Sequence, residues 1–209
     1  MATSTTRRAR AKRTVPSKPG VRVLSRTQVP AAVRTMAEPK GTARFAAGKA
    51  LVVTAEKAPE RVYPHFDAVA AMLGGECKIV RWNAMQVLAR LAPVDKDGKI
   101  EGVLAAYLAF IRGGNLISAA NAIQGLARIT LARPDLSART LPGILSVGNE
   151  TYETPECRNV AIGHALNALA ELWPLVGSRP EVVAFVRKQQ GNMRAAVARK
   201  AKRMGAHLV

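Results

Sequence analysis

Apolar residues recur at intervals of three and four along most of the chain after residue 42. The clearest sets are Val80, Ala84, Leu88 and Leu91, followed by Ile123, Leu126 and Ile129. This spacing places each set on one face of an amphipathic helix, whereas a half-buried strand would alternate every second residue. We therefore expect an all-α protein.

A second helix is expected before each of these segments. The expected partners cover residues 64–73, 100–111, 136–147 and 180–190, and glycine-rich or proline-containing turns separate them from the next helix. Pro64 and Pro180 suit the first turn of a helix, where no amide hydrogen is needed. The pattern predicts consecutive helical hairpins.

The hairpins repeat in sequence. Segments 81–92 and 119–130 align without gaps, so that Leu88 corresponds to Leu126, 38 residues later. The identical pairs are Asn83/Asn121, Ala84/Ala122, Gln86/Gln124, Leu88/Leu126, Ala89/Ala127 and Arg90/Arg128. A third copy covers 162–172 around Leu169, and weaker copies surround Leu51 and begin at Met193. This indicates about five units.

The pattern Val80-Arg81-x-x-Ala84-x-x-x-Leu88-x-x-Leu91 resembles the second helix of proteins in the HEAT-repeat and armadillo-like superfamily. The resemblance covers roughly residues 42–208 and implies a right-handed α-solenoid of about five helical hairpins. Ala119 and Ile162 stand where Arg81 would recur, so the arginine that often tethers neighbouring HEAT units is not repeated. The resemblance predicts the fold and leaves the function open.

Polar residues of the second helices fall in register and form a candidate partner-binding strip. They are Asn83, Gln86, Arg90, Asn121, Gln124, Arg128, His164 and Asn167, with Glu171 at the end of the third copy. Spacings of three and four place each group on one helical face, and the resemblance implies that second helices line a concave surface. The alternative is a solvated face whose side chains hydrogen-bond between repeats.

The net charge of +18 is concentrated at the two ends of the chain. Residues 1–41 carry +9, residues 42–181 carry +2, and residues 182–209 carry +7. We expect residues 1–41 to form a flexible basic arm, disordered when free, before a helical repeat domain at 42–209. An organelle transit segment is the alternative interpretation of the arm.

Both ends carry residues that could bind phosphates, because Lys and Arg neutralise a nucleic-acid backbone regardless of its sequence. The candidates are Arg7, Arg8, Arg10, Lys12 and Arg13 in the arm, and Arg194, Arg199, Lys200, Lys202 and Arg203 in an expected helix at 192–205. For the terminal helix, the alternative is a polar cap that ends the repeat.

No catalytic or cofactor-binding group is evident. His65, His164 and His207 are widely separated, and Cys77 and Cys157 do not form a paired metal motif, so we expect no metal or cofactor. By analogy with HEAT-like DNA glycosylases, an enzyme would depend on Trp82, Trp173 and Asp67, but packing is the simpler role for both tryptophans. We therefore expect a protein that is not an enzyme.

We expect a soluble cytoplasmic protein, since no apolar run approaches the ~18 residues of a membrane span. The predicted function is a scaffold that binds a protein partner on its concave face. Binding of nucleic acid or another polyanion by the basic ends is the alternative, and the nearly neutral middle of the chain argues against a groove that follows a phosphate backbone throughout.

Overall fold

The computed structural model describes residues 21–206, and within that range every regular element is a helix. The α-helices are α1 (Val29–Ala37), α2 (Ala43–Lys57), α3 (Pro59–Val62), α4 (Phe66–Ala71), α5 (Lys78–Leu91), α6 (Lys99–Arg112), α7 (Leu116–Ala132), α8 (Ser137–Ser146), α9 (Pro155–Glu171), α10 (Trp173–Val176), α11 (Pro180–Gln189) and α12 (Ala195–Gly205). Four 3-10 helices join them: η1 (Tyr63–His65), η2 (Met72–Gly74), η3 (Ala92–Val94) and η4 (Pro134–Leu136). The expected all-α class is confirmed. No helix in 21–206 is both long and apolar enough to cross a membrane.

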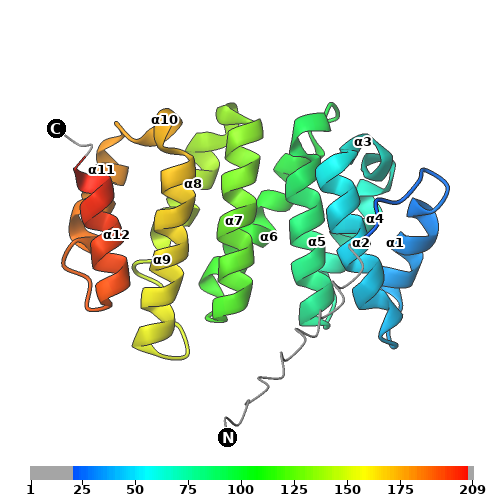
Figure 1. The fold of residues 1–209 in the computed structure, drawn as a ribbon, viewed down its shortest axis with the longest axis horizontal. Helices are drawn as coiled ribbons and strands as arrows, with labels where there is room; N and C mark the ends of the chain where they lie inside the picture. The colour runs from blue at the N-terminus through cyan, green and yellow to red at the C-terminus, as the bar shows by residue number, and fades with distance from the viewer. Residues whose placement is uncertain (1–20, 207–209) are drawn as a thin grey trace, which may run out of the picture.

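The longer helices form a row in chain order. Figure 1 shows α2, α5, α7, α9 and α12 side by side along the long axis of the molecule, with α6, α8 and α11 behind them. Each member of the front row packs against the next, and α1 packs on α2 at one end. Residues that line up between neighbouring front helices therefore share one face of the protein.

The predicted inward register of the repeated leucines is confirmed. Leu88, Leu126 and Leu169 are each 0% exposed, in α5, α7 and α9 respectively. They belong to one hydrophobic core that runs from Val29 to Met204. Leu169 lies about one turn further from the start of its helix than the other two, so α9 has an additional first turn.

The folded region begins earlier than predicted. We expected a flexible arm up to residue 41, but α1 lies within that stretch and buries Val29, Val33 and Met36. The arm assignment is therefore wrong for this helix, because three apolar side chains at helical spacing pack on α2. Residues 1–20, which include Arg7, Arg8, Arg10, Lys12 and Arg13, lie outside the described part of the chain, as does His207.

The predicted helix at 64–73 is interrupted. The chain there forms η1, α4 and η2 in succession after the short helix α3. Pro64 has no amide hydrogen to continue the α-helical pattern of α3, and it lies in the middle of the 3-10 helix that begins at Tyr63. The other predicted helices are present within a few residues of their expected ends.

Candidate functional site

Asn83, the first residue of the predicted strip, cannot contact a partner. It is 8% exposed and faces Gly48 of α2, where an added Cβ would lie only 2.4 Å from the Asn83 side-chain nitrogen. The absence of a side chain at Gly48 lets α2 approach α5 closely. The structure therefore corrects the prediction for Asn83, which is a packing residue between these two helices.

Gln86 and Asn121 meet between α5 and α7. The Gln86 amide Nε2 donates a hydrogen bond of 3.0 Å to Asn121 Oδ1, and Asn121 Nδ2 donates to the Ile117 carbonyl oxygen at 2.9 Å. Both amides are thus engaged within the protein. This contact fits the inter-repeat hydrogen bonding that we considered as the alternative.

Arg90 and Arg128 share one carboxylate, that of Glu56 on α2. Arg90 Nε donates to Glu56 Oε2 at 2.6 Å, and Arg128 Nη1 lies 3.2 Å from the same oxygen. Arg90 also donates to the Gln86 carbonyl oxygen at 2.8 Å. Three front helices therefore bring two positive charges to one negative charge.

The environment of this cluster shifts two of its pKa values. Burial lowers the pKa of Arg90, and the nearby charge of Arg128 lowers it further, against the opposing effect of Glu56. For Glu56, burial alone raises the pKa, but hydrogen bonds and charge from Arg90 and Arg128 outweigh it and lower the pKa overall. Glu56 thus remains ionised, and these three side chains together carry one net positive charge, while Glu171 adds a second carboxylate beside Arg90 and Arg128.

Two cavities flank this arginine pair, and together we call them the Arg90–Arg128 groove. The larger, of about 330 Å³, is lined by Ala55, Glu56, Pro59, Ala89, Arg90, Pro93, Arg128, Leu131 and Ala132. The smaller, of about 100 Å³, is lined by Gln86, Ala89, Arg90, Asn121, Gln124, Gly125, Arg128 and Glu171. The groove has a charged floor and an apolar margin on which Leu131 is 45% exposed.

His164 and Asn167 of α9 lie on a different contact from the rest of the predicted strip. Lys200 of α12 donates to Asn167 Oδ1, and its Nζ lies 3.5 Å from the Gly163 carbonyl oxygen. A cavity of about 200 Å³ between α9 and α12 is lined by both residues of the strip. From α9, Glu171 is the member that reaches the Arg90–Arg128 groove.

His164 is half-buried. Burial lowers its pKa, and the positive charge of Lys200 lowers it further, so the ring is neutral at pH 7. Its Nδ1 atom is buried and has no hydrogen-bond partner in the described part of the chain.

The predicted basic residues of the terminal helix differ in their contacts. Arg194 forms an ion pair with Glu156 in the additional turn of α9. Arg199, Lys202 and Arg203 are exposed and form no ion pair with residues 21–206. Arg187 and Lys188, which lie in the last turn of α11 and were not among the predicted residues, are exposed as well.

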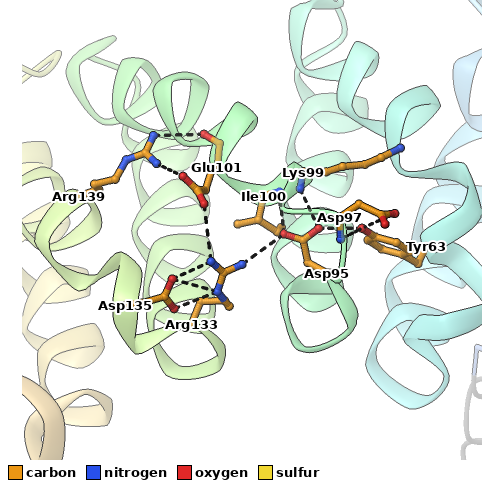
Figure 2. A network of polar contacts seen from close by, with 9 residues as sticks. All are labelled: Tyr63, Asp95, Asp97, Lys99, Ile100, Glu101, Arg133, Asp135 and Arg139. Atoms are coloured by element: carbon orange, nitrogen blue, oxygen red, sulfur yellow. Dashed lines mark hydrogen bonds and ion pairs between the residues drawn. The ribbon is translucent and has the colours of Figure 1, made fainter.

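A polar network that sequence reasoning missed centres on Asp95, in the turn before α6 (Figure 2). The Asp95 side chain is 0% exposed. It accepts hydrogen bonds of 2.9 Å from the backbone amides of Lys99 and Ile100, and one of 2.8 Å from the Tyr63 hydroxyl. An acidic residue before Gly98 and a helix start was the available signal.

Arg133 connects Asp95 to the next hairpin. Its guanidinium lies 3.7 Å from Asp95, 3.7 Å from Glu101 and 2.7 Å from Asp135. Arg139 donates to Glu101 from the start of α8, as Figure 2 shows. The network provides hydrogen-bond acceptors for backbone N–H groups at the start of α6, and it connects neighbouring hairpins. Its role is therefore structural.

The residues considered for an enzymatic site come from three different helices and have partners within the protein. Trp82 Nε1 donates to Ser118 Oγ at 3.0 Å, Asp67 pairs with Lys99 at 2.5 Å, and Trp173 packs on the core. They come from α5, α4 and α10. Among residues 21–206, no three His, Cys, Asp or Glu side chains are grouped so that they could hold a metal ion.

Comparison with known proteins assigns no family: no protein-family model matches this chain, and no curated protein is significantly similar to it. Function is therefore inferred from the surfaces of the molecule.

Proposed function

We propose that this protein is a HEAT-like α-solenoid scaffold that binds an acidic segment of a protein partner in the Arg90–Arg128 groove. The sharing of one carboxylate by Arg90 and Arg128 carries this proposal. The solenoid assignment is supported by the 38-residue offset between Leu88 and Leu126 and by the row of packed helices in Figure 1.

The chemistry of the groove favours a carboxylate ligand. Arginine presents a planar fork of donors that matches the two oxygens of a carboxylate, and such charge-assisted hydrogen bonds are about twice as strong as neutral ones. The Glu56 carboxylate of the same chain already contacts both arginines, where a ligand carboxylate would bind. The Arg128 side chain is 43% exposed, so a carboxylate from a partner can approach it directly, whereas the Arg90 side chain is only 14% exposed.

The margin of the groove supplies a second element of recognition. Leu131 is 45% exposed, and Pro59 and Pro93 line the same cavity. Apolar side chains that remain at the edge of a charged cavity can bury a hydrophobic residue beside the acidic group of a ligand. We therefore propose a segment in which an Asp or Glu is next to an aliphatic or aromatic residue.

The test starts with partners captured from a nuclease-treated lysate by the full-length chain. Each captured protein is then purified, and its dissociation constant is measured against single-residue variants. We expect Arg128→Glu to weaken binding at least about tenfold, equivalent to 1.4 kcal/mol. The matched control is Arg112→Glu, which changes an exposed arginine of α6 that forms no ion pair within residues 21–206.

In a second pair of variants, the test substitution is expected to tighten binding of the partner instead of weakening it. Glu56→Gln removes the internal competitor and should tighten binding, whereas Glu76→Gln, at an exposed site outside the groove, should leave it unchanged. Equal effects of Arg128→Glu and Arg112→Glu would mean that only net charge matters. No effect of either arginine variant would rule out the groove as the binding surface.

A further inference from the structure

The last two described helices carry a large excess of positive charge, and their one acidic residue, Glu181, lies in the first turn of α11. Residues 182–206 contain seven Lys and Arg and no Asp or Glu. These cations are Arg187, Lys188, Arg194, Arg199, Lys200, Lys202 and Arg203. Only Arg194 forms an ion pair within the described part of the chain. α11 and α12 pack together at one end of the row in Figure 1, so the unpaired charges gather there.

Lys200 adds a cation inside a groove. It projects from α12 toward α9, where its Nζ contacts Asn167 Oδ1 and the Gly163 carbonyl oxygen. Burial lowers the pKa of Lys200, and the charge of Arg203 lowers it further. The cavity around it, of about 200 Å³, is lined by His164, Asn167 and Arg194 and by no acidic residue. An anion in this cavity would supply the missing counter-charge.

Helix electrostatics account for only part of this arrangement. Cations in the last turn of a helix interact favourably with its dipole. This effect explains Arg187 and Lys188 in α11, and Lys202 and Arg203 in α12. The effect falls off within that turn, and Arg199 is further from the helix end. A terminal helix also needs only a polar outer face, which mixed charges would provide.

We infer that this surface binds the phosphate backbone of a nucleic-acid duplex. The surface consists of the exposed residues Arg187, Lys188, Arg199, Lys202 and Arg203, together with Lys200 in the α9–α12 cavity. Repeated unpaired cations are what a phosphate backbone requires, and such binding is tolerant of sequence. The inference is independent of the proposed function, because the Arg90–Arg128 groove shares no lining residue with the α9–α12 cavity.

The lack of exposed aromatic residues favours a duplex over a single strand. Single-strand binders stack bases on aromatic side chains. Between residues 180 and 206 the only aromatic residue is Phe185, which is 8% exposed. This surface therefore offers charge without a stacking platform.

The experiment measures binding of the full-length chain to a short labelled DNA duplex of mixed sequence, and to one of its strands, by fluorescence anisotropy across a salt series. Three five-residue variants are compared, each with Lys or Arg changed to Gln. The end variant changes Arg187, Lys188, Arg199, Lys202 and Arg203. The control changes five exposed cations elsewhere that form no ion pair in the described structure: Lys49, Lys57, Lys78, Lys96 and Arg112. The arm variant changes Arg7, Arg8, Arg10, Lys12 and Arg13.

The three variants lose the same net charge, so their comparison locates the surface. Each phosphate contact contributes about 0.9 to the slope of log K against log salt, so the end variant should lower that slope by about 4. We expect it to lose at least about ten times more affinity than the control or the arm variant, at about 100 mM salt. The wild type should bind the duplex more tightly than the single strand.

Lys200 is tested separately, because its role is to hold a phosphate in the cavity. Lys200→Met retains most of the packing volume and should weaken duplex binding several-fold, while Lys200→Arg should retain it; circular dichroism melts verify that both are folded. The inference is overturned by absence of wild-type binding at low salt, by equal losses in the end and control variants, by loss of binding in the arm variant alone, or by tighter single-strand binding.

Discussion

The ring of Tyr107 lies directly against the backbone of Gly125. A Cβ added to Gly125 would be 2.3 Å from Tyr107 Cε1, a distance that real Cβ contacts do not reach. The Tyr107 hydroxyl also donates a hydrogen bond to the Met85 carbonyl oxygen, and the side chain is fully buried. One residue of α6 thereby joins α5 and α7.

The first prediction concerns that contact. Gly125→Ala should destabilise the protein by about 1–3 kcal/mol, because the buried ring is held by its hydroxyl and cannot move away from the new methyl group. Gly102→Ala is the matched control in α6, where a Cβ meets nothing within 4 Å. It should stabilise the helix by about 0.5–1 kcal/mol. Urea unfolding of both variants gives the two free energies, and equal values would contradict the described packing.

The second prediction concerns the Asp95 network. Asp95→Asn places an amide group opposite the backbone N–H groups of Lys99 and Ile100, so at least one buried donor loses its acceptor. We expect a loss of about 2–4 kcal/mol. Asp97→Asn should cost less than about 0.5 kcal/mol, since this exposed residue has only peripheral contacts with Tyr63. Thermal melts compare the two, and a mild effect of Asp95→Asn would show that the network is not structural.

The third prediction uses the three tyrosines of the chain, Tyr63, Tyr107 and Tyr152. Burial, together with the hydrogen bond to Asp95, raises the pKa of Tyr63 to about 12. Burial, together with the charges of Glu150 and Glu153, raises the pKa of Tyr152 to about 12. Complete burial raises the pKa of Tyr107 as well. The folded protein should therefore show little tyrosinate absorbance near 295 nm at pH 10.5.

The same shifts give a pH dependence of stability. A tyrosine whose pKa is higher in the folded state stabilises the fold fully below its unfolded pKa of about 10. That contribution is lost as the pH rises from about 10 toward the folded values. In urea, all three residues should titrate near pH 10. A native titration that ionises one or more tyrosines at that pH would contradict the raised pKa values and, for Tyr107 and Tyr152, their burial.

The fourth prediction tests the register of the repeated leucines. Leu126→Asp places a carboxylate in the core and should cost several kcal/mol, about 3 or more. Leu131→Asp, in the same helix at a position 45% exposed, should change stability by less than about 1 kcal/mol. Chemical unfolding separates the two variants. Similar melting of wild type and Leu126→Asp would disprove the register.

The helical class, the hairpins from α5 onward and the inward leucines could be predicted from the sequence alone. These features depend on short-range patterns in the sequence. Residues three and four apart share a helix face, so the periodicity of Leu88 and its neighbours already specifies which side of the helix is buried. Helix α1 could not be predicted in this way. It is only nine residues long in a basic stretch, and short helices depend on tertiary packing, here of Val29, Val33 and Met36 on α2.

The two aligned asparagines show what only the tertiary structure decided. Asn83 and Asn121 occupy the same position in their repeats, yet Asn83 is buried against Gly48 while Asn121 hydrogen-bonds to Gln86 on the surface. Their contacts differ because the preceding front helix presents Gly48 to Asn83 but Gln86 to Asn121. A repeat pattern specifies equivalent positions without specifying equivalent neighbours.

Long-range pairing of charges was equally beyond the sequence. Glu56 lies 34 residues from Arg90 and 72 residues from Arg128, and nothing in the local pattern of any of the three indicates the others. The hydrophobic periodicity determined which helices form and which sides they bury. The distances between packed helices decided which polar side chains meet, because a charged contact depends on atoms being within a few ångströms in space, whatever their separation along the chain.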